Sequence, residues 1–357
     1  MRSFHIQTRP RPYLAIIERG ILGRISRYIP KDTGKIFILT TRDVWELHGA
    51  KLEEGLTARA AEILFFPGGE ERKRLASLEI LAEQMVRRGG DRTSLVVAFG
   101  GGIVNDLGGF LASVFMRGVP VLQVPTTLLA QVDAAIGGKT GVNLTTGKNL
   151  LGTFHQPVAV LIDPDVLSTL AEREYRAGVY EVLKCGIIRS LNLFSLMSAK
   201  HEQVLARAPA IVELMIAESV RIKAEVVSAD EREGDLRRIL NFGHTYGHAL
   251  EAATGYVQFL HGEAVAFGMR AATHLAELLG LLPPDAKAQI LQAISLYGPI
   301  PSLERVSAEE LVARLASDKK TVRGKVHFVL PEAIGKVRIV SGVSDDLLLA
   351  AARAALS

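Results

Sequence analysis

The sequence is poor in cysteine and in aromatic residues, nearly balanced in charge, and free of long apolar runs. Cys185 is its single cysteine, so no disulfide can form within the chain. The first ten residues lack the apolar run of a secretory signal peptide, and no window reaches the roughly 18 uninterrupted apolar residues of a membrane helix. We therefore expect a protein of the reducing cytoplasm without a membrane-spanning segment.

The distribution of charge bears on the kind of partner. The 42 basic and 38 acidic residues leave a formal net charge of only +4. The basic residues are scattered along the chain, and aromatic residues, at 6%, do not alternate with them in a stripe. This distribution argues against nucleic-acid binding and favours a small anionic ligand.

Length and apolar content predict two domains. At 357 residues the chain is too long for a domain with one typical core. Its 48% of apolar residues is enough to form a large buried interior. The first half alternates short β-rich runs with helical patterns, which predicts an α/β domain with a parallel sheet. The expected strands are 14–17, 36–40, 63–66, 95–99, 121–124 and 158–162, and the expected helices include 70–88 and 104–115.

The pattern changes after Asp163-Pro164, where strands give way to long apolar-periodic helices. We expect helices near 174–190, 208–229, 261–280, 285–297 and 307–317, with a small hairpin of 326–330 and 336–340. The sequence therefore predicts an α/β domain over 1–163 and a helical domain over 164–357.

A histidine-rich stretch in the second half is the first candidate site. His244 and His248 are four residues apart, so on a helix both imidazoles would project from one face and offer two nitrogens to one metal. An ordinary polar helix face explains the same spacing equally well. Gly243 and Gly247 favour a metal site, because each destabilises a helix by roughly 1 kcal/mol relative to alanine. A helix face that is merely exposed to solvent has no need of glycine. His261 adds a third imidazole from a separate element.

Gly100, Gly101 and Gly102 follow an expected strand and precede an expected helix. Backbone amides in such a turn can approach a phosphate at the helix N-terminus. The run is not the dinucleotide fingerprint, because Asn105 stands where its third glycine belongs and no acidic residue follows about twenty positions later. By itself the loop fits a tight turn as well as a nucleotide site.

Two further glycine-rich stretches carry lysines. Lys139 and Lys148 each follow a glycine, which presents the ammonium group on exposed backbone, as phosphate binding requires. Solvated lysines in loops would give the same pattern. Because the two lysines lie close in sequence to each other, to Asp133 and to Asn149, we favour an anion site.

Taken together, these stretches resemble 3-dehydroquinate synthase. The resemblance rests on Gly100 to Asp106, the run 125–143, Gly147-Lys-Asn149, Glu181-Val-Leu-Lys184, the run 237–244 and His261-Gly-Glu263, and it extends from about 66 to 340. It implies an N-terminal α/β domain that binds NAD, an all-α C-terminal domain that carries zinc or cobalt, and an active site in the cleft between them.

The resemblance also implies a reaction. The family converts 3-deoxy-D-arabino-heptulosonate 7-phosphate to 3-dehydroquinate and phosphate, the second step of the shikimate pathway to aromatic amino acids. NAD oxidises the substrate transiently, phosphate is eliminated, the hydride returns, and the ring opens and closes again by an aldol step. NAD is therefore catalytic and is not consumed.

The metal ligands implied by the resemblance differ from the pair that helical spacing suggests. In the family a glutamate and two histidines bind the metal, here Glu181, His244 and His261. His248 becomes a neighbouring catalytic residue instead of a ligand. Three protein ligands leave open positions, as in a catalytic zinc site.

Other positions receive roles only through the resemblance. Those expected around the substrate phosphate are Lys139, Asn149 and Lys184, and those expected at its carboxylate are Lys223, Arg237 and Asn241. One of Lys319 and Lys320 is expected to close over the site. The expected NAD contacts are Asp133 at the nicotinamide ribose and, elsewhere, Glu70, Lys73, Gly100, Gly101, Gly102, Asp106, Thr126, Thr127, Lys139 and Lys148.

Arg117 carries the expectation about assembly. At this position family members reach across a dimer interface to the substrate phosphate of a partner, so the resemblance implies a homodimer. By itself the sequence favours a surface arginine.

Some positions depart from the family pattern. Thr41 stands where an acidic residue is expected on the adenosine ribose, so the preference for NAD over NADP depends on whether Asp43 takes its place. Asn105, Tyr180 and Cys185 also depart, but none of them removes a catalytic group.

Three other functions fit part of the pattern. Sibling cyclases, such as 2-deoxy-scyllo-inosose synthase and 2-epi-5-epi-valiolone synthase, would share the fold, NAD and zinc, but their substrates lack the carboxylate that Lys223, Arg237 and Asn241 would bind. A metal-dependent polyol dehydrogenase acts on substrates without phosphate, which the lysines at 139, 148 and 184 argue against. A non-catalytic binding protein gives no reason to keep a complete ligand set.

Overall fold

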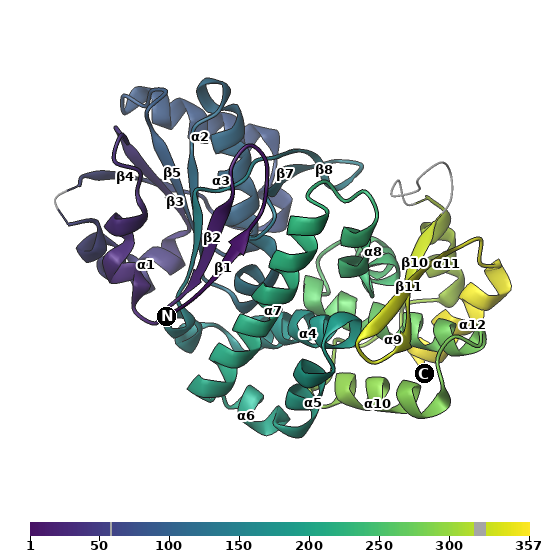
Figure 1. The fold of residues 1–357 in the computed structure, drawn as a ribbon. Helices are drawn as coiled ribbons and strands as arrows, with labels where there is room; N and C mark the ends of the chain where they lie inside the picture. Colours follow the sequence, from purple (N-terminus) through teal and green to yellow (C-terminus); the bar gives the residue numbers. More distant parts are fainter. Residues whose placement is uncertain (58, 318–325) are drawn as a thin grey trace. The chain divides into compact units, whose positions relative to one another are not determined.

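The computed structural model describes residues 1–57, 59–317 and 326–357, and the chain divides into two compact units (Figure 1). The first unit comprises Met1–Ala171 and Lys223–Arg232, and the second comprises Glu172–Ile222 and Glu233–Ser357. The first change of unit falls a little after the expected boundary at residue 163. The return of 223–232 to the first unit has no counterpart in the sequence pattern.

A seven-stranded sheet forms the centre of the first unit. Its order is β1-β2-β9-β6-β5-β3-β4; β1 and β2 are antiparallel and every other neighbouring pair is parallel, which confirms the predicted parallel sheet. All six expected runs are strands, and the edge strand β1 was not predicted. The strands are β1 Arg2–Ile6, β2 Tyr13–Ile17, β3 Ile36–Thr40, β4 Ala61–Phe65, β5 Leu95–Gly100, β6 Val121–Pro125 and β9 Ala159–Ile162.

Helices cover both faces of this sheet. The covering elements are η1 Ile21–Tyr28 and α1 Arg42–Leu56 on one face, and α2 Leu75–Arg87 and α3 Gly102–Val114 on the other. Ile36 and Ile38 of β3 pack into the first core, whereas Phe37 and Leu39 pack into the second. Figure 1 shows α1 and α2 on opposite sides of β3 and β5. Because both faces are covered, the inner strands are almost entirely apolar, and their polar residues Thr40 and Gln123 are buried.

Helix α1 was not predicted. Gly49 and Gly55 lie within it, and glycine lowers intrinsic helix propensity. Leu52 and Leu56 are nevertheless buried in the core beneath the sheet. Tertiary packing therefore offsets the loss of helix propensity that the two glycines cause.

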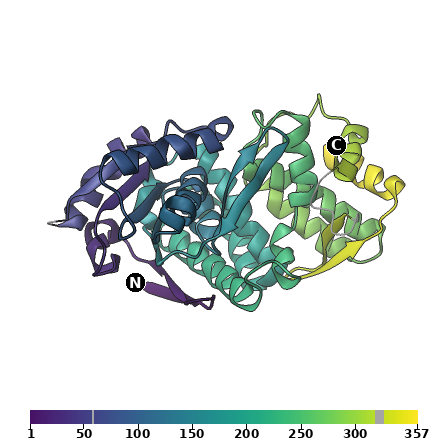
Figure 2. The same cartoon turned by 90° about the horizontal axis from the view of Figure 1, so that it is seen from above.

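The glycine-rich stretch that carries Lys139 and Lys148 forms an antiparallel hairpin, which the sequence patterns did not identify. Its strands are β7 Lys139–Leu144 and β8 Gly147–Phe154, which run side by side as a ribbon (Figure 2). Gly141 pairs with Gly152, and a Cβ atom on Gly141 would lie 2.6 Å from the Leu151 carbonyl oxygen. Glycine permits this close approach but has low β-propensity. For that reason the sequence pattern did not predict the hairpin.

Helices dominate the second unit. Helix α9 His261–Leu278 packs against four other helices and strand β10. All five expected long helices are present, whereas α5, α6 and α12 were not predicted. The helices besides α9 are α4 Glu172–Arg189, α5 Leu191–Ala199, α6 His201–Leu205, α7 Pro209–Ala229, α8 His244–Ala253, α10 Pro284–Ser295, α11 Ala308–Ser317 and α12 Asp345–Leu356.

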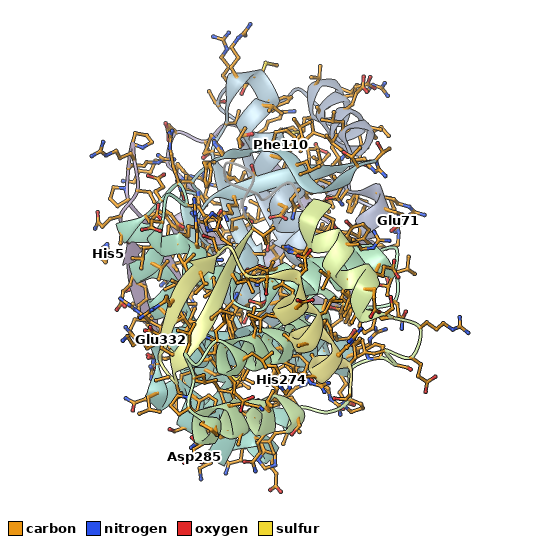
Figure 3. All side chains as sticks on the ribbon, turned by 90° about the vertical axis from the view of Figure 1, so that its right-hand side faces the viewer. His5, Glu71, Phe110, His274, Asp285 and Glu332 are labelled. Carbon is orange, nitrogen blue, oxygen red and sulfur yellow. The ribbon has the colours of Figure 1, made fainter. Side chains whose placement is uncertain are left out.

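The expected C-terminal hairpin is present. It consists of β10 His327–Ala333 and β11 Lys336–Ser341. Glu332 on β10 (Figure 3) forms ion pairs with Lys336, at 3.1 Å, and with Arg338. These pairs link residues at the turn end of the hairpin.

Glycines bring the helices of the second unit together at backbone distance. A Cβ atom on Gly247 of α8 would lie 2.9 Å from the Ala264 carbonyl oxygen of α9, and one on Gly262 of α9 would overlap the Ala177 carbonyl oxygen of α4. Close approach of helices therefore explains why α8 contains a glycine at a cost in helix propensity. None of the helices in the described ranges is long and apolar enough to cross a membrane.

The C-terminal end of α7 is tied to the first unit by polar contacts. The Gln7 backbone N–H donates to Ser228 Oγ at 2.9 Å, and the Arg9 backbone N–H donates to Glu231 Oε2 at 3.0 Å. Gln156 donates to the other Glu231 oxygen at 2.9 Å. These bonds explain why 223–232 belongs to the first unit although α7 begins in the second.

Candidate active site

Three helices of the second unit bring Glu181, His244 and His261 together. Helix α4 carries Glu181, α8 begins at His244 and α9 begins at His261. The Nε2 atoms of His244 and His261 lie 3.9 and 3.8 Å from the same oxygen, Glu181 Oε1. One ligand atom from each residue lies within 4.8 Å of the other two. This convergence of one oxygen and two nitrogens fits a metal site with an open coordination position.

The surroundings of Glu181 also fit a cation. Its side chain is 1% exposed, and Oε2 forms an ion pair with the equally buried ammonium group of Lys184. Among the described residues, no donor makes a hydrogen bond to Oε1. A buried carboxylate oxygen without a donor is costly unless a cation binds it, so the donor set fits a divalent metal.

Both histidines turn Nε2 toward Glu181 and Nδ1 toward another oxygen. For His244 that oxygen is the Phe242 carbonyl, at 3.1 Å. For His261 it is Glu251 Oε1, at 3.6 Å. A protonated Nδ1 leaves the Nε2 lone pair available as a metal ligand.

His248 lies one turn after His244 on α8, as its spacing predicts, and the two ring centroids are 5.5 Å apart. It belongs to a second group of ligand atoms within 4.8 Å of one another, formed with Glu251 and His261. In the described part of the chain no such group combines His244 with His248. Helical spacing alone therefore suggests a pair that the structure does not offer, because the partner of His244 comes from another helix.

Glu263 fixes the first turn of α9. Its carboxylate accepts hydrogen bonds from the Leu260 backbone N–H at 2.8 Å and from Arg173 Nε and Nη2 at 2.7 and 2.8 Å. Arg173 belongs to α4, the helix that carries Glu181. The Arg173–Glu263 pair thus joins the helices that carry two of the three candidate ligands, which gives the third residue of the His261-Gly-Glu263 motif a structural role.

The glycine loop has the predicted arrangement of strand, turn and helix. Gly100 ends β5, Gly101 is the N-cap of α3, and Gly102 is its first residue. A Cβ atom on Gly101 would lie 3.1 Å from Thr127 Cγ2. A bare backbone at a helix N-terminus can donate hydrogen bonds to a phosphate, so this loop fits the expected NAD pyrophosphate contact.

A buried lysine connects several of the predicted site residues in the first unit. Lys73 is 2% exposed, forms an ion pair with Asp106 and donates to Asn149 Oδ1 at 2.6 Å. Asn143 extends the network by donating to Glu70 Oε1 and accepting from the Asn149 backbone N–H, both at 2.8 Å. Burial raises the pKa of the Asp106 carboxyl, and Lys73 opposes that rise. The network joins residues expected at the cofactor with Asn149, expected at the substrate phosphate.

Asp133 and Lys223 are also brought together. Asp133 lies on a single π-helical turn, η4 Ala130–Ala134, a distortion that is often found at functional sites. The ammonium group of Lys223 forms an ion pair with the Asp133 carboxylate and donates to its carbonyl oxygen at 2.6 Å. A residue expected at the nicotinamide ribose is thus paired with one expected at the substrate carboxylate.

The remaining predicted residues differ in burial. Arg237 is buried on η6 Leu236–Asn241, and Asn241 donates to Glu233 Oε1 at 2.7 Å. Thr126 is buried and Thr127 half-buried just after β6, and Lys148 is half-buried on β8. Exposed positions are Asp43, Arg117 and Lys139. The expectation for Lys319 and Lys320 lies outside the described residues.

Sequence reasoning gave no role to Glu251 or Asn143, which the structure places against predicted site residues. Glu251 follows His244 by seven residues and His248 by three, so helical periodicity puts all three on one face of α8. That spacing could have predicted Glu251 as a site residue. No sequence pattern could have predicted Asn143, because its position depends on a hairpin that the sequence did not indicate.

Comparisons with known proteins point to one family. A family model described as 3-dehydroquinate synthase N-terminal matches residues 63–177, and one described as 3-dehydroquinate synthase C-terminal matches 178–321. A curated 3-dehydroquinate synthase of Solibacter usitatus is 61% identical over 100% of both chains. Another, of Koribacter versatilis, is 48% identical over 98% of this chain and 97% of the relative.

Solved structures show related folds. A 2-deoxy-scyllo-inosose synthase complexed with carbaglucose-6-phosphate, NAD+ and Co2+ has a TM-score of 0.88 and 26% identity, with 99% of each chain covered. A 2-epi-5-epi-valiolone synthase from Streptomyces hygroscopicus with NAD+ and Zn2+ bound has a TM-score of 0.88 and 29% identity, with 98% of each covered. A probable glycerol dehydrogenase from Sinorhizobium meliloti, with a TM-score of 0.69, 14% identity and 96% of each covered, shows the fold alone.

Proposed function

The chain belongs to the 3-dehydroquinate synthase family, and on that basis we propose that it converts 3-deoxy-D-arabino-heptulosonate 7-phosphate to 3-dehydroquinate and phosphate. The observation that carries the proposal is the convergence of Glu181, His244 and His261 on one point of the helical unit. Family membership supplies the reaction class, and the donor set supplies its metal site.

We assign the metal to Glu181, His244 and His261, and zinc or cobalt fits two nitrogens and one oxygen best. The bound metal supplies Lewis acidity that lowers the pKa of a substrate hydroxyl and so favours oxidation of its carbon at neutral pH. Lys184 balances the charge of Glu181 through Oε2 and leaves Oε1 directed at the two imidazoles.

The first unit is assigned to NAD, which supplies a hydride acceptor that is regenerated in each turnover. The Gly100–Gly102 turn at the start of α3 offers its backbone N–H groups to the pyrophosphate. Asp133 is assigned to the nicotinamide ribose and the Lys73–Asp106 pair to a position along the cofactor. Because Lys73 and Lys223 are paired with carboxylates in the structure, ligand binding would exchange those partners for anionic groups of the ligand.

The substrate contacts stay proposals. Lys139, Asn149 and Lys184 are assigned to the phosphate, and Lys223, Arg237 and Asn241 to the carboxylate. A planar guanidinium can bind a carboxylate through two parallel hydrogen bonds, which suits the buried Arg237 to this task. Holding the ring-opened species in one conformer would then favour the aldol closure that gives the product.

We further propose a homodimer in which Arg117 reaches the substrate phosphate of the partner. Arg117 is exposed, and it and Met116 both have positive φ angles, 71° and 49°. Positive φ at non-glycine residues costs on the order of 1–3 kcal/mol each, and such strain is concentrated at functional sites. The cytoplasmic location and the preference for NAD over NADP at Thr41 also stay predictions.

A sibling cyclase is the second candidate, because solved structures of 2-deoxy-scyllo-inosose and 2-epi-5-epi-valiolone synthases share this fold. The two candidates differ in the substrate carboxylate. The higher identity to 3-dehydroquinate synthases over the full chain favours the first.

The test is phosphate release from the heptulosonate phosphate with added NAD, before and after treatment with a chelator. Activity should require both cofactors and should return when zinc or cobalt is restored. Equal turnover of an analogue without the carboxylate would overturn the assignment in favour of the sibling enzymes. Absence of phosphate release from either substrate by the metal-loaded protein would overturn both.

A further inference from the structure

We propose that Glu251 is a positioning residue for the metal ligand His261, acting through Nδ1 of its imidazole. The inference rests on the metal site of the proposed function and adds to it a residue that belongs to none of the assigned contacts. It concerns how the ring of His261 is oriented and kept in the tautomer that can bind a metal.

The geometry of His261 requires such a partner. Its two nitrogens face two carboxylates of the same unit: Nε2 lies 3.8 Å from Glu181 Oε1, and Nδ1 lies 3.6 Å from Glu251 Oε1. A nitrogen directed at a metal must carry a lone pair, so the ring proton has to be on Nδ1. A carboxylate at Nδ1 stabilises that tautomer, because it can only accept a hydrogen bond.

His244 shows the same arrangement with a different acceptor. Its Nε2 lies 3.9 Å from Glu181 Oε1, and its Nδ1 lies 3.1 Å from the Phe242 carbonyl oxygen. The backbone thus orients one ligand and Glu251 the other. His261 has greater need of a side-chain partner, because its side chain is 31% exposed against 10% for His244 and packing restrains it less.

Burial of the Glu251 carboxylate favours its contact with a positively charged metal site. Its side chain is 1% exposed, and a buried carboxylate is stable only when paired with donors or positive charge. When Nε2 of His261 binds a cation, Nδ1–H becomes a stronger donor and the positive charge extends over the ring toward Glu251. Carboxylates in this position raise the basicity of the histidine, and their loss typically weakens metal binding 10- to 100-fold.

The other use of Glu251 would be a second metal, because His248, Glu251 and His261 also bring ligand atoms within 4.8 Å of one another. A second metal would need Nδ1 of His261, so the ring would have to lose both protons and bridge two cations. An imidazole that bridges two cations must give up a second proton, which costs more free energy than donating that proton to a carboxylate. We therefore assign Nδ1 to Glu251; their 3.6 Å separation is longer than a hydrogen bond, so the proposed bond forms when metal binding draws the two groups slightly closer.

The test is cobalt binding to the metal-free protein, measured by competition with a chromophoric chelator and by the visible spectrum of the bound ion. Wild type should bind one equivalent. Glu251→Gln, which keeps the size of the side chain but loses its charge, should bind about 10- to 100-fold more weakly and shift the spectrum. Excess cobalt should restore its activity, which it would not do for a variant that is merely misfolded.

Glu218→Gln is the matched control. Glu218 is a carboxylate of the same unit that pairs with Arg221 and Ser190, so its loss costs hydrogen bonds away from His261. Its cobalt affinity should equal that of wild type. Glu251→Asp keeps the charge but withdraws the carboxylate, so it should also bind cobalt more weakly, and it serves if Glu251→Gln does not fold.

The outcomes separate the inference from the proposed function. Wild-type affinity and spectrum in Glu251→Gln would overturn the positioning role while the metal site stands. Two equivalents in wild type, falling to one of full affinity in Glu251→Gln, would overturn it in favour of a second metal site. Failure of wild type to bind cobalt or zinc at all would overturn the metal site itself.

Discussion

The two units hold their candidate residues in different electrostatic states. In the α/β unit the buried cations already face carboxylates, as Lys73 faces Asp106 and Lys223 faces Asp133. In the helical unit Glu181 Oε1 and two imidazole nitrogens converge, and in the described chain no hydrogen-bond donor reaches that oxygen. Converging acceptors favour a cation, whereas paired charges must exchange partners when a ligand binds. The candidate ligands of the helical unit thus already converge, whereas the buried cations of the α/β unit would have to change partners.

A second comparison, between two buried carboxylates, shows why convergence matters more than burial. Asp163 in the α/β unit also has a buried oxygen, Oδ2, with no hydrogen bond among the described residues. Its other oxygen accepts from the backbone N–H groups of Gly20 and Asp165, both at 3.1 Å. Asp163 caps a turn and belongs to no group of metal-ligand atoms in the described chain. Burial with an unbonded oxygen is therefore not enough to identify a metal ligand.

The largest effect is expected from breaking the helical site. His261→Ala should abolish tight metal binding, by more than about a hundredfold in affinity, and with it activity, because it removes one of three ligands. His248→Ala should retain the metal. Metal analysis of the purified variants checks both. A metal-free His248→Ala together with a fully loaded His261→Ala would show that the ligand assignment is wrong.

The next effect tests two exposed cations of the α/β unit, in contrast to the buried Lys73 and Lys223. Arg117→Ala and Lys139→Ala should each be nearly inactive, because each removes a phosphate contact from both sites of the proposed dimer. After subunit exchange, half of the dimers would be hybrids with one intact site, so about a quarter of wild-type activity should return. No recovery after verified exchange would contradict a role of Arg117 in the partner's site.

A smaller effect is expected at the substrate carboxylate. Arg237→Ala should weaken substrate binding by about 2–5 kcal/mol, because a charged pair is lost in a desolvated position, while the affinity for NAD should hardly change. Arg238→Ala, on the same turn and less buried, is the matched control. Titrations of the metal-loaded protein with substrate and with NAD would measure both. Equal losses for the two ligands would point to general damage instead.

The smallest effect concerns the buried carboxylate that is not assigned to a metal. Burial raises the pKa of the Asp163 carboxyl, and the backbone N–H groups of Asp165 and Gly20 oppose the rise. The folded state then binds the proton more tightly than the unfolded state, so the free energy of unfolding falls as pH rises from the unfolded pKa, about 4, through the raised folded pKa. Asp163→Asn should remove this decline, on the order of 1 kcal/mol per unit of pKa difference.

Denaturant unfolding of both proteins at several values between about pH 4 and 7 measures the decline. Asp165→Asn, which changes a more exposed carboxylate that pairs with Arg19, is the control. The same pH dependence in wild type and Asp163→Asn would contradict the assignment of the slope to this residue.

Some of this molecule follows from local sequence alone. Runs such as 36–40 and 95–99 are typical of strands in a covered sheet, because all their residues except Thr40 are apolar and five residues are few for a helix. The long helices of the second half follow from their periodicity, and Gly100 to Gly102 between strand and helix follow from order along the chain. The resemblance added Glu181, which no spacing could single out among the 38 acidic residues.

Tertiary structure alone decided which charged groups meet. Glu181 lies on α4, His244 on α8 and His261 on α9, and glycines at 247 and 262 let those helices approach at backbone distance. The β7–β8 hairpin places Asn143 and Asn149 beside Glu70 and Lys73, and contacts with Gln7, Arg9 and Gln156 assign 223–232 to the first unit. Periodicity describes one element at a time, whereas the partner of a buried charge is set by the packing of elements that are distant in sequence. For that reason the sequence indicated the inner strands and the long helices and, through resemblance, the chemistry, whereas packing placed Glu251 beside His261.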